Sequence, residues 1–233
     1  MTDSSARTAV VWLVLRAELA RRGELAILDV GGGSGGFAVP LAQLGHTVTV
    51  VDPSPDALAT LARRADAGGV AARITAVQGD ADTLLDVVAP CGADLVLCHS
   101  VLEVVDDPAA TLLVIGAALR VGGCASVLVA NRAAAVLSRA IGAHFAEASS
   151  VLLAGAAREG GTRRFDREPL IGLLAAVGLR VEQAHGVRVV ADLVPGAVAD
   201  ADGESLRQLE LELSARSPYR DIATQLHLLA RKT

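Results

Sequence analysis

The stretch that decides the fold is Leu28-Asp29-Val30-Gly31-Gly32-Gly33-Ser34-Gly35-Gly36. An apolar run at residues 25–30 precedes the glycines, and residues 37–44 follow them as a helix whose first turn must contain Pro40. Glycines between a strand and a helix let the backbone take positive φ and approach a ligand closely. The N–H groups at the start of the helix are free to bind that ligand. We therefore expect a ligand-binding turn.

Strands and helices alternate outward from this turn. The pattern predicts an amphipathic helix that ends before Gly23, and a helix at 55–66 with Ser54 as its N-cap. Further helices are expected at 109–119, where Val121-Gly122-Gly123 would stop the helix, and at 169–177 and 206–215. Strands are expected at 25–30, 46–51, 73–77, 94–98, 124–130, 179–184 and 225–231. This alternation predicts an α/β fold with a Rossmann-like, doubly wound, mostly parallel seven-stranded sheet in a single domain.

Composition raises the question of a membrane segment. The chain has 233 residues, of which 52% are hydrophobic and 2% aromatic, and its mean hydropathy is +0.46. A spanning helix needs about 20 apolar residues, and polar residues, glycine or proline interrupt every run before that length. The N-terminus lacks the positively charged region of a signal peptide. We expect no membrane segment and a cytoplasmic location.

The cysteines argue against a metal site, and the net charge argues against indiscriminate binding of nucleic acid. Cys91, Cys98 and Cys124 are odd in number and lack metal-type spacing, so we expect small buried side chains and no metal site. The net charge of −5 argues against indiscriminate phosphate binding. Residues 131–190 nevertheless carry a net charge of +3, against −8 for the remainder. That segment is compatible with an RNA-binding face, and the alternative is that its arginines are simply solvated.

The glycine spacing fits two ligand classes. Gly31, Gly33 and Gly36 match the GxGxxG of dinucleotide-binding proteins, whereas Gly31, Gly33 and Gly35 match the GxGxG of methyltransferases that use S-adenosylmethionine. Both classes place an acid at the end of the second strand to hold ribose hydroxyls, and Asp52 occupies that position.

Three further features favour the methyltransferase class. Asp29 lies two residues before Gly31, where an acid can order the loop and meet the amino group of a methionine moiety. Gly79-Asp80-Ala81-Asp82 follows the third strand, where a carboxylate can accept the adenine amino hydrogens and Ala81 N–H can face the ring. The fourth strand runs into a segment from Cys98 to Pro108, at the sheet edge where doubly wound folds bind ligands.

With these motifs the chain resembles the class I S-adenosylmethionine-dependent methyltransferases over residues 7–130. It is most similar to the tRNA 5-carboxymethoxyuridine methyltransferases, which esterify a modified wobble uridine. The stretches that carry this narrower resemblance are Ala6-Arg7-Thr8-Ala9-Val10-Val11-Trp12, residues 99–108, Gly186-Val187-Arg188-Val189, residues 209–212, Ser217-Pro218-Tyr219 and Ala230-Arg231-Lys232. The resemblance implies a cofactor-binding half at 1–130 and an acceptor-side half at 131–233.

The resemblance also implies roles for individual residues. Arg7 would pair with the methionine carboxylate of S-adenosylmethionine, and His99 would sit beside the cofactor at the mouth of the acceptor pocket. The remaining cofactor residues would be Asp29, Gly31, Gly32, Gly33, Asp52, Asp80 and Ala81.

A carboxylate acceptor is anionic near pH 7 and needs no general base, so cations should hold it. The acceptor-side candidates are Arg188, Tyr219, Arg163, Arg164, Arg167 and Asn131. A base role for His99 is then optional.

Three functions remain open. The leading hypothesis is methylation of a carboxymethoxy-modified wobble uridine, with tRNA bound through residues 131–190. The second is methylation of a small-molecule carboxylate or hydroxyl, which the acidic charge and the scarcity of aromatic residues favour. The third is a non-catalytic cofactor-binding protein, against which Asp29, Asp52, Asp80 and His99 argue. The oligomeric state is left undetermined.

Overall fold

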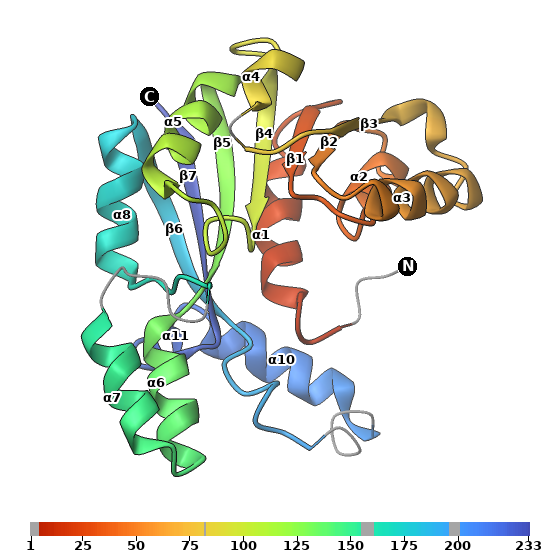
Figure 1. Ribbon diagram of the computed structural model, residues 1–233. Helices are drawn as coiled ribbons and strands as arrows, with labels where there is room; N and C mark the ends of the chain where they lie inside the picture. The colour runs from red at the N-terminus through yellow and green to blue at the C-terminus, as the bar shows by residue number, and fades with distance from the viewer. Residues whose placement is uncertain (1–4, 82, 155–160, 196–200) are drawn as a thin grey trace.

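The computed structural model describes residues 5–81, 83–154, 161–195 and 201–233, and its centre is one seven-stranded sheet (Figure 1). The strand order is β3-β2-β1-β4-β5-β7-β6. The bounds are β1 (Ala26–Val30), β2 (Thr47–Asp52), β3 (Ile74–Gln78), β4 (Ala93–His99), β5 (Leu119–Ala130), β6 (Leu179–Val187) and β7 (Gln225–Lys232). Strand β7 pairs antiparallel with β5 and β6, and the other pairs are parallel. The Rossmann-like, mostly parallel sheet expected from the sequence is confirmed.

Helices cover both faces of this sheet (Figure 1). One face packs against α1 (Ala9–Leu19), α2 (Ala38–Gln43) and α3 (Pro55–Ala67). The other packs against α4 (Leu84–Val87), α5 (Pro108–Ala118) and α8 (Arg167–Ala176). Beyond the carboxyl ends of the parallel strands lie α6 (Arg132–Ile141), α7 (Phe145–Ala154), α10 (Gly203–Leu213) and α11 (Tyr219–Ile222). A short 3₁₀ turn, Ala71–Arg73, leads into β3.

Burial on both faces explains the high hydropathy. Every residue of β4 from Ala93 to Cys98 is buried, as are the last four residues of β1. A parallel sheet with helices on both faces needs near-continuous apolar strands, which raises hydropathy without any membrane contact. Across the part of the chain that the structure describes, no helix combines the length and apolar character needed to cross a bilayer.

Capping and proline signals in the sequence correctly predicted how α2 and α3 begin. Ser54 caps α3, its Oγ accepting a hydrogen bond of 3.2 Å from Ala57 N, and Pro40 lies in the first turn of α2. The expected stop of α5 at residues 121–123 was wrong, because α5 ends at Ala118 and β5 already begins at Leu119. Gly123 lies inside β5, where a Cβ would stand 3.0 Å from the carbonyl oxygen of Asp94. The glycine therefore permits close approach of β4 and β5.

Four short helices, α4, α6, α7 and α11, were not expected from the sequence. The cysteines were expected to be buried. Cys98 and Cys124 are buried, whereas Cys91 is exposed.

Candidate functional site

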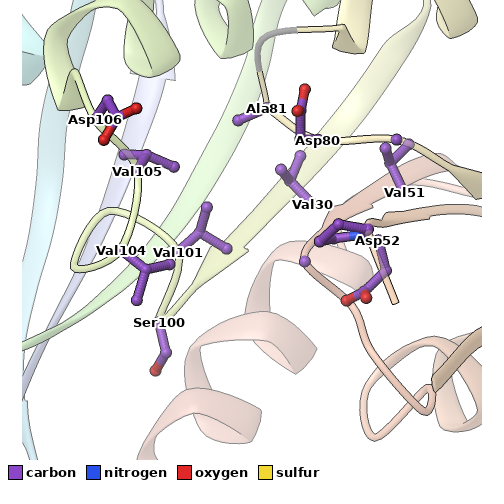
Figure 2. A pocket seen from close by; sticks show the side chains of 13 residues that line it. Val30, Val51, Asp52, Asp80, Ala81, Ser100, Val101, Val104, Val105 and Asp106 are labelled. Atoms are coloured by element: carbon purple, nitrogen blue, oxygen red, sulfur yellow. The ribbon is translucent and has the colours of Figure 1, made fainter. Parts of the chain in front are cut away.

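The strand order creates a crevice at one edge of the sheet. The chain runs from β1 outward to β2 and β3, and then returns to β4 on the other side of β1. Such a reversal separates the connections that leave the carboxyl ends of β1 and β4, and ligands bind in that crevice in doubly wound folds. A cavity of about 410 Å³ lies there (Figure 2). Its lining residues are Val30, Gly31, Val51, Asp52, Pro53, Gly79, Asp80, Ala81, Ser100, Val101, Val104, Val105 and Asp106.

The glycine loop closes one side of the cavity. Gly31 has φ +68°, and its N–H donates a hydrogen bond of 2.7 Å to Val51 O. A Cβ on Gly31 would stand 2.5 Å from Val101 Cγ2, and a Cβ on Gly32 would stand 2.5 Å from Asp29 Oδ2. Neither glycine can carry a side chain without displacing its neighbours, so the loop backbone itself forms the wall.

Asp52 joins the loop to the second strand. Its Oδ2 accepts a hydrogen bond of 2.9 Å from Gly33 N, and its Oδ1 accepts one of 2.9 Å from Ser54 N. Both oxygens are therefore oriented by backbone amides while the side chain lines the cavity (Figure 2). A carboxylate in this position can accept hydrogen bonds from ligand hydroxyls through its remaining lone pairs.

Asp29 lies beneath the loop and is buried. Burial raises its pKa to about 7, and the negative charge of Asp52 contributes in the same direction. A carboxyl group in this state can accept a proton from, or pair with, a cationic ligand group that approaches the loop.

Asp80 and Ala81, which follow β3, also line the cavity (Figure 2). The Oδ1 atom of Asp80 accepts a hydrogen bond of 3.0 Å from Thr83 N, which fixes the turn into α4. Ala81 is buried against the wall. Valine side chains line the cavity on both sides of this region, and their apolar surface suits a planar ring (Figure 2).

His99 is the last residue of β4. Its side chain is not among the groups that line the described cavity; instead the ring packs edge-on against Phe37, with centroids 4.8 Å apart. Burial lowers the pKa of His99 to about 4, so the ring is neutral at pH 7.

Ser100, which the sequence did not single out, lines the cavity with φ +59° (Figure 2). Its place directly after a parallel strand was the available signal.

Arg188 and Arg7 both contact the carboxylate of Asp192. Arg188 directly follows β6, has φ +61°, and its guanidinium is 2.6 Å from Asp192 Oδ2. Arg7 reaches Asp192 Oδ1 at 3.6 Å. Tyr219 begins α11 and is 46% exposed. Since β6 runs parallel to β4 and β5, Arg188 lies at the same edge of the sheet as the cavity.

The loop that carries Arg188 is held by a residue that sequence reasoning missed. Glu210 of α10 is fully buried and accepts hydrogen bonds of 2.7–2.9 Å from the backbone N–H groups of Val189, Val190 and Ala191. No local pattern marks Glu210, because its partners lie about 20 residues away in the chain.

The arginines of the basic segment are engaged within the chain. Arg132 pairs with Asp166, and Arg167 lies 3.1 Å from Asp221. Arg163 donates to Val105 O at 3.1 Å and to Asp106 O at 3.3 Å, so it braces the cavity wall from behind.

Two other residues of the segment 131–190 need separate comment. Asn131 caps α6, with its Oδ1 accepting from Ala133 N, and serves a structural role there. Residue 158, an arginine counted in the basic segment, lies outside the described residues. Within the described ranges, no group of three or more His, Cys, Asp or Glu is arranged to hold a metal ion.

Comparison with known proteins bears on both halves of the site. Residues 28–125 match the family model for a methyltransferase domain. The tRNA 5-carboxymethoxyuridine methyltransferase of Escherichia coli (strain K12) is 29% identical over 242 residues, covering 99% of this chain and 90% of that protein.

Two further matches support less, one because it covers under half of the chain and the other because its sequence identity is low. A ubiquinone biosynthesis O-methyltransferase of Methylocella silvestris is 37% identical over 113 residues, covering 46% of this chain and 41% of that protein. Among solved structures, an S-adenosylmethionine-dependent methyltransferase from Mesorhizobium loti aligns over 100% of both chains, with a TM-score of 0.68 and 22% identity. At that identity the likeness concerns the fold.

Proposed function

Because this chain is a class I S-adenosylmethionine-dependent methyltransferase, we propose that it methylates the carboxylate of a carboxymethoxy-modified wobble uridine in tRNA. The observation that carries the proposal is the extent of the match to the E. coli tRNA enzyme, which covers 99% of this chain. The match therefore includes the acceptor-side half at 131–233, where Arg188 and Tyr219 lie. The match to the ubiquinone biosynthesis enzyme covers less than half of the chain.

The size of the cavity and the hydrogen-bond acceptors in its wall support this cofactor. A cavity of about 410 Å³ is within the usual range for small-molecule sites, and its walls are valines with carboxylates at Asp52 and Asp80. In this proposal Asp52 accepts the ribose hydroxyls, while Asp80 and Ala81 receive the adenine edge (Figure 2). When bound, S-adenosylmethionine supplies an electrophilic methyl group on a sulfonium, and the protein supplies orientation.

The glycine loop and two charged residues would hold the methionine end. In this proposal Gly31, Gly32 and Gly33 let the backbone approach the ligand, and Asp29, which is buried next to Gly32, pairs with the amino group. Arg7 would hold the carboxylate. The Arg7 side chain is 63% exposed and its contact with Asp192 is long, at 3.6 Å, so it can move to a ligand at little cost.

The acceptor side favours a substrate that is already anionic. The pKa of His99 is lowered to about 4, which makes the ring a weak base, and the ring packs edge-on against Phe37 and does not line the described cavity. A carboxylate acceptor needs no general base. We assign the acceptor carboxylate to Arg188, which lies at the same edge of the sheet as the cavity and whose guanidinium already pairs with a carboxylate, that of Asp192.

Two experiments test whether tRNA is the methyl acceptor. Deleting the gene in the source organism should remove a methyl ester from wobble nucleosides, as seen by mass spectrometry of digested tRNA. Purified protein with methyl-labelled cofactor should then label tRNA from the deletion strain but not tRNA from the parent strain. Mild alkali should release the label, because it hydrolyses an ester and leaves a methyl ether intact. An unchanged nucleoside profile and unlabelled tRNA would refute the tRNA assignment.

A small-molecule acceptor is the second candidate, because the net charge is −5 and the chain has few aromatic residues for stacking bases. The ion pairs of Arg132 and Arg167 within the chain point the same way, since they leave less positive charge for phosphates. This candidate predicts no labelled tRNA and a labelled small molecule in a metabolite extract of the deletion strain.

A further inference from the structure

One wall of the cavity is a loop made of turns and bends. This wall loop, residues 100–106, runs from the end of β4 to the start of α5, and most of its side chains line the cavity (Figure 2). One end is fixed by β4 and the other by Asp107, whose Oδ1 accepts a hydrogen bond of 2.8 Å from Ala109 N in the first turn of α5. Between these ends the position of the loop depends on hydrogen bonds from other segments.

A single residue supplies three of those hydrogen bonds. The backbone N–H of Arg163 donates to Glu103 O at 2.8 Å. Its guanidinium donates from Nη1 to Val105 O at 3.1 Å and from Nη2 to Asp106 O at 3.3 Å. Because the guanidinium is a rigid planar fork of donors, it can hold two successive carbonyl groups in one geometry. Val105 and Asp106 are themselves residues of the cavity wall.

The segment that carries Arg163 is anchored independently of the arginine side chain. Phe165 is buried, its N–H donates to Ala130 O at 2.9 Å, and its carbonyl accepts from Arg132 N at 3.0 Å. The segment thus lies along the end of β5. The wall loop is fastened to the same strand end, because Glu103 Oε1 accepts from Ala130 N at 2.8 Å. Arg163 therefore extends from a fixed base to the wall loop.

We propose that Arg163 is a positioning residue for cofactor binding, and that it acts by holding the wall loop in place beside the bound S-adenosylmethionine. Arg163 does not line the described cavity, so its effect on the cofactor passes through the loop. The proposal separates two arginines of the segment 131–190: Arg163 serves the cofactor and Arg188 serves the acceptor. It deepens the proposed function, because it rests on placing the cofactor in this cavity.

The first test needs no methyl acceptor. Isothermal titration calorimetry of the full-length protein should show about 10-fold weaker binding of S-adenosylhomocysteine to Arg163→Ala, because two charge-assisted hydrogen bonds to the loop are lost. Arg163→Lys keeps the charge but lacks the planar fork, so its affinity should lie between those of Arg163→Ala and the wild type. Wild-type affinity in either variant would overturn the proposal.

Steady-state kinetics with tRNA distinguishes a cofactor role from an acceptor role and from a general loss of structure. In Arg163→Ala the KM for S-adenosylmethionine should rise about 10-fold, while kcat at saturating cofactor and KM for tRNA each change by less than about 2-fold. A raised KM for tRNA with normal binding of S-adenosylhomocysteine would place Arg163 on the acceptor side and overturn the proposal.

Arg120→Ala is the matched control. Arg120 also donates to a backbone carbonyl, that of Gly92 at 3.2 Å, but it lies at the start of β5, at the opposite edge of the sheet from the cavity. This variant should bind S-adenosylhomocysteine like the wild type. Equal weakening in Arg120→Ala and Arg163→Ala would show a general effect of losing an arginine and overturn the proposal.

Asp52→Ala, measured in the same calorimeter, separates failure of this inference from failure of the proposed function. Weaker binding in Asp52→Ala with wild-type affinity in Arg163→Ala would leave the cofactor in the cavity and refute only the role of Arg163. Wild-type affinity in Asp52→Ala would remove the cofactor from the cavity and overturn both.

Discussion

Gly33 N donates a hydrogen bond of 2.9 Å to Asp52 Oδ2, so the glycine loop and the second strand share one carboxylate. The other oxygen of Asp52 is held by Ser54 N. The side chain that we propose to bind the ribose is thus also the one that fixes the loop over β1. Cofactor affinity and loop geometry should therefore depend on the same residue.

Replacing Asp52 with alanine should weaken S-adenosylmethionine binding by about 10- to 100-fold. The reason is that a charged hydrogen-bond acceptor contributes about 1.5–3 kcal/mol. Isothermal titration calorimetry with S-adenosylhomocysteine measures the change. Asp56→Ala, on the exposed first turn of α3, is the control and should bind normally. An unaltered affinity in the Asp52 variant would mean that the cofactor lies elsewhere.

Gly32→Ala should reduce both cofactor binding and stability. The new Cβ would stand 2.5 Å from Asp29 Oδ2 and 2.9 Å from Val50 Cγ1, so strand and loop must separate. Gly36→Ala is a matched control in the same loop, since a Cβ there meets nothing within 4 Å. Thermal denaturation with and without S-adenosylhomocysteine compares the two variants. Equal behaviour of the two would contradict the close packing described for the loop.

Asp29 should make stability depend on pH. Its pKa is about 7 in the folded protein, above the ordinary value of 3.8, so the folded state binds this proton more tightly than the unfolded state. The resulting stabilisation is full below about pH 4 and is lost as the pH rises through about 7. Urea denaturation at pH 5 and pH 8 should show a smaller pH-dependent loss in Asp29→Asn than in the wild type. The same loss in both proteins would exclude Asp29 as its source.

Glu210→Ala should lower the free energy of unfolding by about 3 kcal/mol, because it leaves buried backbone N–H groups at residues 189–191 without an acceptor. Glu212→Ala, an exposed neighbour on α10, should change stability by less than about 0.5 kcal/mol. Urea titration gives both values. Similar small effects in the two variants would show that the loop after β6 does not depend on Glu210.

Arg188→Ala should raise KM for the acceptor about 10-fold or more while leaving cofactor affinity unchanged, because we assign its guanidinium to the acceptor carboxylate. Arg180→Ala removes an exposed arginine at the opposite end of β6 and serves as the control. Steady-state kinetics with tRNA compares the KM of the two variants. A loss of cofactor affinity in Arg188→Ala would instead place that arginine on the cofactor side.

The cofactor half of the site could be read from the sequence because its signals are local. Gly31 directly follows β1, Asp52 is the last residue of β2 and Asp80 comes two residues after β3, and parallel strands bring their carboxyl ends to one edge. The apolar runs likewise predicted the sheet, since strands buried on both faces show it in their own residues. Ser100 also follows a strand directly and lines the cavity, but a single serine in that position matches no motif.

The sequence by itself determined the alternation of strands and helices, the glycine loop and the acids that follow the strands. Only the tertiary structure decided which distant side chains meet. Ser126 and His227 are 101 residues apart, and they touch because β7 inserts antiparallel between β5 and β6. Arg7 and Asp192 also lie far apart in the chain and meet only in the folded protein. Such pairs leave no local pattern, because their spacing is set by strand order and register and not by the period of a helix or strand.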